Sequence, residues 1–209
     1  MPPAIAGNQI VRTPARQMAR IAGALYLAIG VTSIYGFYRP KTRLAFHSGL
    51  VALAVFVIVV VLLYFLFKPV SRSLSFAAAL FGMAGSAMGV LNSLHLAPFR
   101  MHNLVFFAFY CALIGILIVR SSFMPRFVGV LMVIAAPGYL TLLWPPLGNS
   151  LRPWNLIPGA VGELTLAVWL LIKGVDQQRW SEQSRAAPGW RNNCATSSIE
   201  IAAKWKKTA

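Results

Sequence analysis

Hydrophobic residues gather into six long runs along the chain, and short polar segments separate these runs. The hydrocarbon core of a bilayer is about 30 Å thick and needs about 20 helical residues to cross it, with about 17 as the lower limit. All six runs are therefore candidate transmembrane helices, and the fourth and the sixth are close to the lower limit. They lie at residues 21–37, 47–67, 74–97, 104–119, 127–144 and 156–172.

This pattern predicts an all-α fold, a polytopic membrane helix bundle with six transmembrane helices, because lipid cannot satisfy the open backbone groups of other structures. We expect a cytoplasmic N-terminal segment at 1–15, the six-helix transmembrane domain at 16–175 and a basic, flexible cytoplasmic tail at 176–209. The first run resembles a signal peptide, but bulky aromatic residues stand where a cleavage site needs small ones. We therefore expect the first helix to be retained.

Composition also indicates a membrane protein. Of the 209 residues, 58% are hydrophobic and only 11% are charged, whereas about a quarter of the residues of a soluble domain are charged. The formal net charge is +15. The basic residues fall between apolar runs rather than along a polar face with interleaved aromatic residues, so we expect no nucleic-acid partner. The partner that the composition implies is the lipid bilayer.

The basic residues indicate the orientation in the membrane. Fourteen of the 19 Lys and Arg residues lie in the N-terminal segment, the second and fourth connections and the tail, and five lie in the other three connections. By the positive-inside rule, both termini face the cytoplasm. The basic residues of the C-terminal tail either rest on anionic lipid headgroups, where each contributes on the order of 1 kcal/mol, or belong to a solvated, disordered tail.

Single residues within the runs bear on helix packing. Gly85 and Gly89 have the four-residue spacing that lets two helix backbones approach closely. We favour packing within the chain, with a homo-oligomer through the same pair as the alternative. Pro137 lies well inside the fifth run and predicts a kink. Cys111 and Cys194 lie in such different settings that a disulfide between them is not expected.

Glu163 is the one acidic residue in the first 175 positions, and it lies inside the sixth run. An acid at the centre of a span costs about 2.5–3.5 kcal/mol on insertion scales, so such residues usually face the bundle interior and find partners there. Glu163 follows Asn155 by eight residues, which places it about 12 Å deep and near the midplane at 1.5 Å per residue. This placement makes Glu163 the leading candidate for a functional residue.

Polar groups of other helices are expected at the same depth as this acid. The candidate intramembrane polar site consists of Glu163, Asn92, His95, His102 and Asn103, and the hydroxyl groups of Tyr26, Tyr110 and Tyr139 are within reach of it. In one interpretation, Glu163 binds a proton or a cationic group in a polar cavity. In the other, it is hydrogen-bonded to Asn92 or Thr165 and locks the packing of the helices. Three scattered histidines and one acid make a weak metal site, so we expect no metal and no other cofactor.

Four stretches resemble a bacterial family, that of the domain of unknown function 4386. They read RIAGALYLAIGV at 20–31, LLYFLFKPVSRSL at 62–74, YCALIGILIVRSSFMPRFVGVLMVIAAPGYL at 110–140 and VGELTLAVWLLIKGVDQQRW at 161–180. The resemblance covers about residues 16–180 and implies a small integral membrane protein of the bacterial inner membrane with no known activity. Glu163 lies in the family-like GEL motif at 162–164.

No catalytic motif is present, because the sequence contains no GxSxG elbow, HExxH motif or phosphate loop, and we assign no catalytic residue. Three functions stay open. The first is a non-enzymatic structural or partner-binding membrane protein in which Glu163 orders the bundle. The second is a small transporter or proton-coupled permeation protein, in which a water-accessible cavity should reach Glu163. The third is a membrane-embedded enzyme for a lipophilic substrate, in which His95 or His102 should lie beside the carboxylate.

Overall fold

The computed structural model describes residues 15–38, 43–96 and 103–186. Helices make up most of these residues, and no strand occurs among them, so the all-α prediction is confirmed. Six long helices follow the six predicted runs. They are α1 (Ala15–Tyr38), α2 (Arg43–Phe67), α3 (Arg72–Ser93), α4 (Leu104–Arg120), α5 (Arg126–Leu140) and α7 (Ile157–Ile172).

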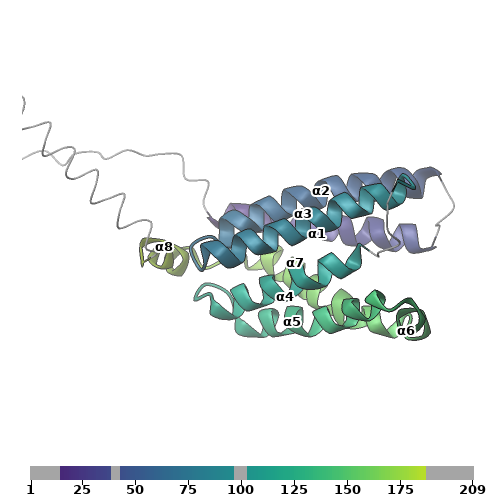
Figure 1. Ribbon diagram of the computed structural model, residues 1–209. Coiled ribbons are helices and arrows are strands. Elements are labelled where there is room, and N and C mark those ends of the chain that lie inside the picture. The colour runs from purple at the N-terminus through teal and green to yellow at the C-terminus, as the bar shows by residue number, and fades with distance from the viewer. Residues whose placement is uncertain (1–14, 39–42, 97–102, 187–209) are drawn as a thin grey trace, which may run out of the picture.

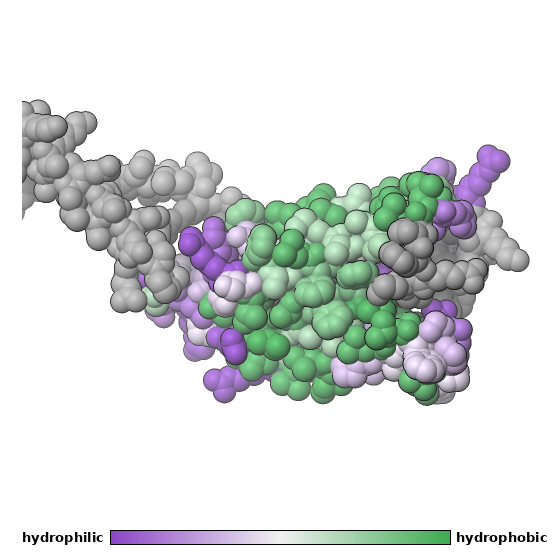
Figure 2. Space-filling model, viewed as in Figure 1, coloured by the Kyte–Doolittle hydropathy of each residue, from purple (hydrophilic) through white to green (hydrophobic). Residues whose placement is uncertain are grey.

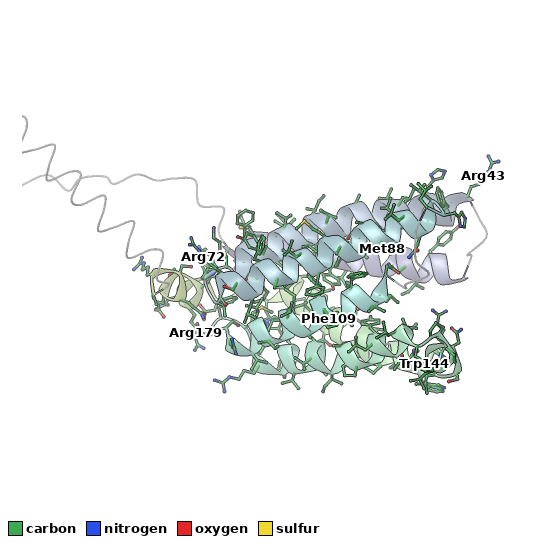
Figure 3. The ribbon with its side chains drawn as sticks, in the orientation of Figure 1. Arg43, Arg72, Met88, Phe109, Trp144 and Arg179 are labelled. Carbon is green, nitrogen blue, oxygen red and sulfur yellow. The ribbon has the colours of Figure 1, made fainter. Side chains whose placement is uncertain are left out.

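These helices have the length and surface of membrane spans. Five helical segments are long and apolar enough to cross a membrane, and α4 is a shorter apolar helix of 17 residues. Figure 2 shows hydrophobic residues over the middle of the molecule and hydrophilic residues gathered at its two ends. In Figure 3, Arg72 and Arg179 lie at one end, which we call the basic end, and Arg43 and Trp144 lie at the opposite end. The chain is therefore a multi-pass membrane protein, in agreement with the predicted six spans.

The six long helices form a closed ring in chain order. Each packs against the helix before it and the helix after it, and α7 packs against α1 to close the ring. In Figure 1, α1, α2 and α3 lie in the upper part of the molecule, α4 and α5 lie in the lower part, and α7 lies between the two groups. The side chains that point into this ring therefore come from helices far apart in the sequence.

The contact between α4 and α5 depends on two glycines that face each other. A Cβ on Gly115 would lie 2.7 Å from the carbonyl oxygen of Gly129, and a Cβ on Gly129 would lie 2.6 Å from the carbonyl oxygen of Gly115. The two backbones thus touch directly, as small residues permit in membrane helices.

The Gly85 and Gly89 pair also packs within the chain. A Cβ on Gly85 would lie 3.3 Å from Cβ of Phe106 on α4, and a Cβ on Gly89 would lie 2.8 Å from Cδ2 of Leu53 on α2. Both glycines are buried. This is the intramolecular packing that we favoured from the sequence.

A folded connection joins α5 to α7 at the end opposite the basic end. It contains η1 (Thr141–Leu143), α6 (Pro145–Ser150) and η2 (Trp154–Leu156). The buried Asn155 holds these turns together, because its Nδ2 donates to Oγ1 of Thr141 at 2.8 Å and to the carbonyl oxygen of Gly148 at 3.3 Å. The helix α5 ends three residues after Pro137, and the kink at that proline stays a prediction.

A short helix, α8 (Gln177–Ala186), follows α7 at the start of the segment that we predicted to be a flexible tail, and the domain boundaries stay predictions. Asp176 begins the helix, because its Oδ1 accepts hydrogen bonds from the backbone N–H groups of Gln178 and Arg179. Trp180 then docks the helix, since its indole Nε1 donates to the carbonyl oxygen of Leu66 at 2.9 Å. That carbonyl belongs to the last turn of α2, where helix carbonyls lack partners in their own helix. Residues 187–209 lie outside the described residues.

Trp180→Phe is expected to loosen α8 from the bundle, because the phenyl ring cannot donate to Leu66. A hydrogen bond of about 1 kcal/mol corresponds to an about fivefold increase in the undocked population. The measurement is the rate of trypsin cleavage after Arg179, followed by mass spectrometry. Trp154→Phe is the matched control, because Trp154 is 73% exposed at the opposite end. Equal cleavage rates in the two variants would show that the indole does not hold α8.

Candidate functional site

Glu163 lies at the centre of the span that contains α7. The span covers Trp154–Ile172, and Glu163 is equally far from both of its ends, as the depth estimate from the sequence predicted. Gly159 precedes Glu163 by four residues, so the two lie on the same face of the helix, one above the other. The side chain of Glu163 is partly buried. Its surroundings are therefore set by the helices that pack on this face.

The hydrogen-bond partner of Glu163 is Tyr139 on α5. The phenol of Tyr139 donates to Oε1 of Glu163. Gly159 makes this bond possible, because a Cβ at that position would collide with the Tyr139 ring and hydroxyl. One of the two interpretations had Asn92 or Thr165 as the partner, but Thr165 donates to the carbonyl oxygen of Val161 in its own helix. Asn92 is on α3, which packs mainly against α2 and α4.

Two further tyrosines and a cysteine lie in the vicinity of the carboxylate. Tyr26 on α1 is 4% exposed, Tyr110 on α4 is 1% exposed, and both hydroxyl groups lack a hydrogen-bond partner among the described residues. Both tyrosines and the free thiol of Cys111 lie close enough to Glu163 to interact with it electrostatically. Cys194, the other cysteine, lies outside the described residues. The interior of the ring thus holds one acid with several weakly acidic groups around it.

Aromatic rings fill the space next to this acid. The central aromatic cluster consists of Tyr26, Phe56, Phe107, Tyr110 and Tyr139, from α1, α2, α4 and α5. Neighbouring ring centroids are 5.2 to 6.3 Å apart, which is the usual spacing of attractive aromatic pairs. The cluster packs the ring interior and gives Tyr139 its fixed orientation toward Glu163.

Three of the other four candidate residues are described by the structure, and none of these three is part of the central aromatic cluster beside Glu163. The imidazole of His95 is exposed just beyond the end of α3, at a residue with positive φ of 56°. Asn103 lies at the start of α4, with its side chain close to Gly89 of α3. Asn92 lies near the end of α3, and His102 is outside the described residues. Among the described residues, no three His, Cys, Asp or Glu side chains are grouped as a metal site requires.

The chemistry available at this site is narrow. A carboxyl group and a phenol that share a hydrogen bond can hold or exchange a proton, and their neighbours are phenols and a thiol rather than a second carboxylate. Sequence analysis identified the acid and named all three tyrosines as groups within reach. It missed Cys111, whose burial in an apolar run gave no sign of the acid beside it.

Comparisons with known proteins agree with the resemblance seen in the sequence. The matching family model, described as "Domain of unknown function (DUF4386)", covers residues 99–174, which contain α4, α5 and α7. An uncharacterized protein of Archaeoglobus fulgidus is 30% identical over 132 residues, covering 56% of this chain and 76% of the relative. The chain belongs to this family. No solved structure matches this DUF4386 protein.

The segment that matches the DUF4386 model contains most of the site. Tyr110, Tyr139 and Glu163 lie within residues 99–174, whereas Tyr26 comes from α1. The acid and its hydrogen-bond partner therefore belong to the half of the ring that the family model describes. Family membership supplies no reaction, so the function must be inferred from the site itself.

Proposed function

We propose that this DUF4386 protein is a non-enzymatic membrane protein of the structural or partner-binding kind, in which Glu163 orders the helix bundle. The observation that carries the proposal is the hydrogen bond from Tyr139 on α5 to Glu163 on α7. The bond joins two helices that are neighbours in the ring, and it gives a partner to an acid whose insertion costs about 2.5–3.5 kcal/mol.

The positions of the hollows support this proposal. Two hollows among the described residues have volumes of about 390 and 350 Å³. Both are at the basic end, where Phe123, Trp169 and Asp176 line them, and Glu163 lines neither. A transporter that uses Glu163 was expected to have a water-accessible cavity reaching that residue, and neither of these two hollows does so.

One observation favours the proton-coupled permeation protein as a second candidate. The buried hydroxyl groups of Tyr26 and Tyr110 have no hydrogen-bond partner among the described residues, and they lie near Glu163. Such groups can relay a proton to or from the carboxylate. Among the residues that the structure describes, the enzyme hypothesis has no comparable support, because the imidazole of His95 is exposed beyond the end of α3.

We also propose that both termini face the cytoplasm and that the membrane is a bacterial inner membrane. The orientation is supported by the basic end, where the helical segments carry Arg16, Arg72, Arg126, Lys173 and Arg179. The positive-inside rule assigns such an end to the cytoplasm.

A double-mutant cycle tests whether Glu163 orders the bundle. We expect Tyr139→Phe and Glu163→Leu each to lower the free energy of unfolding by about 1–2 kcal/mol, since each removes one partner of the bond. The double variant should lose about 1 kcal/mol less than the sum, because the second substitution has no bond left to remove. The measurement is unfolding of the full chain in bicelles. Strictly additive losses would refute the locking role.

Glu163→Gln is the control that separates the two candidate functions. The amide oxygen of Gln still accepts from Tyr139, so stability should stay close to that of the wild type. We expect proteoliposomes of the wild type and of Glu163→Gln to show the same background proton flux, measured with a pH-sensitive dye. A wild-type flux that Glu163→Gln abolishes would overturn the proposal in favour of the second candidate.

A further inference from the structure

A hollow of about 390 Å³ lies at the basic end, where the start of α1, the end of α7 and the start of α8 meet. It is lined by Arg16, Phe123, Trp169, Lys173, Gly174 and Asp176, together with two neighbouring residues of the α7–α8 connection. Neither Glu163 nor Tyr139 takes part in it. The hollow is therefore separate from the central site.

Two basic side chains in this hollow have no partner in the part of the chain that the structure describes. Arg16 and Lys173 are exposed, and neither side chain forms an ion pair or hydrogen bond there. The stem of Arg16 packs over Gly174, since its Cγ would lie 3.1 Å from a Cβ at that position. Gly174 has a φ of +67°, the left-handed conformation that commonly ends a helix. The turn that ends α7 thus helps to place Arg16 on the wall of the hollow.

The one acidic residue among those that line the hollow is already engaged. Oδ2 of Asp176 lies 3.5 Å from Nε of Arg179, and Oδ1 accepts the hydrogen bonds that begin α8. Its negative charge is therefore balanced by Arg179 and by the N-terminus of the helix. Arg16 and Lys173 remain free to bind an anion.

Apolar side chains form another part of the wall of the hollow. Phe123 is 4% exposed and Val175 is 3% exposed. Trp169 packs edge to face against Phe127, with ring centroids 5.5 Å apart, and Phe127 is 50% exposed. Figure 2 shows that hydrophilic residues at this end adjoin the hydrophobic belt of the molecule. A ligand in the hollow would meet cations on one side and aromatic rings at the level of the membrane boundary on the other.

We propose that this hollow binds the phosphate of an anionic phospholipid, with Arg16 and Lys173 as its cationic contacts. Guanidinium and ammonium groups both bind phosphate by charge-assisted hydrogen bonds. Trp169 in the wall of the hollow contacts the half-exposed Phe127, and together they offer an apolar surface that suits the glycerol and the upper acyl chains. A free phosphate ion would bind the two cations in the same way, but it has no apolar part to contact the aromatic residues.

The test uses the full-length protein in detergent and three probes. These are dioctanoyl phosphatidylglycerol, dioctanoyl phosphatidylcholine and inorganic phosphate, with binding read from native mass spectrometry and thermal stabilisation. We expect saturable binding of the phosphatidylglycerol only. The Arg16→Gln/Lys173→Gln variant should raise its Kd about 30-fold, because each basic residue near an anionic headgroup contributes about a factor of five. Lys173→Gln alone should raise it about fivefold, which keeps the test decisive if the double variant does not fold.

The matched control is Arg72→Gln/Arg126→Gln, which removes the same charge from exposed residues at the same end but outside the hollow. Its affinity for phosphatidylglycerol should match that of the wild type. An equal loss of affinity in this control would mean diffuse electrostatic attraction and would overturn the site. Equal binding of inorganic phosphate would overturn the lipid assignment, and equal binding of phosphatidylcholine would overturn the role of the two cations.

Discussion

Gly129→Leu is expected to abolish the folded bundle. Its Cβ would lie 2.6 Å from the carbonyl oxygen of Gly115 and 2.9 Å from the backbone nitrogen of Val119, so the backbones of α4 and α5 would have to separate. Overpacking in ordinary cores costs about 1–3 kcal/mol, and there the neighbours are side chains that can shift. Since the neighbours here include backbone atoms, we expect a loss above about 3 kcal/mol. The measurement is the yield of monodisperse protein in size-exclusion chromatography.

Gly30→Leu is the matched control for this substitution. Gly30 lies within α1, and a Cβ there would have no heavy atom within 4 Å. A leucine facing lipid at this position should leave the yield unchanged, because the added side chain meets no helix. If Gly129→Leu gave the same yield as Gly30→Leu, the close approach of α4 and α5 would not be needed for the fold.

The second large effect is expected for Gly159→Ala. The new methyl group would collide with the ring and hydroxyl of Tyr139 and push the phenol away from Glu163. Overpacking and the loss of the hydrogen bond should together lower the free energy of unfolding by about 2–4 kcal/mol. Denaturation in bicelles measures the loss. Ala160→Leu is the matched control, because Ala160 is the exposed neighbour on the same helix.

A second substitution shows whether the collision is with Tyr139. Tyr139→Leu makes room for the methyl group, so Gly159→Ala should cost much less in that background than in the wild type. In that background the hydrogen bond to Glu163 is already absent, so Gly159→Ala can neither remove it nor overpack the phenol. The same cost in both backgrounds would place the collision elsewhere.

The membrane spans could be predicted from the sequence because the bilayer sets their length and apolar character. The predicted run 104–119 and the helix α4 (Leu104–Arg120) differ by one residue. The short helix α8 could not be predicted in this way, since its residues are polar on average. Two residues mark this helix: Asp176, which caps its first turn, and Trp180, whose indole donates a hydrogen bond to α2.

The order of the helices in the ring could not be predicted, because lipid and the bundle interior select the same kinds of side chain. On α2, Ile58 is 51% exposed and Leu63 is fully buried, yet both are large and apolar. In a soluble protein, the exposed position would be polar and the periodicity would reveal the buried face. Here the sequence gives the depth of a residue but not the direction in which its side chain points.

The same limit explains the partners assigned to Glu163. Depth alone placed Asn92, His95, His102 and Asn103 in the candidate site with Tyr26, Tyr110 and Tyr139 as groups within reach. The structure brings the three tyrosines to the acid, because α1, α4 and α5 turn them into the ring. His95 and Asn103 lie where α3 ends and α4 begins. Acids in apolar helices are easy to find in a sequence, whereas their partners depend on how each helix is rotated.

The closing contact of the ring has a consequence for biosynthesis. Gly23 packs against the backbone of Leu171, so α1 cannot make this contact until α7 has been synthesised. At about 5–20 residues per second, synthesis of the intervening chain takes roughly 7–30 s. The buried residues of α1 around this contact are Ala19, Ala22 and Gly23, which carry no polar side chain, and Tyr26, one turn farther along, adds a phenol to the same buried face. Glu163 is on the last span, and Tyr139 is synthesised before it. The acid therefore enters the bilayer only after its hydrogen-bond donor is already there.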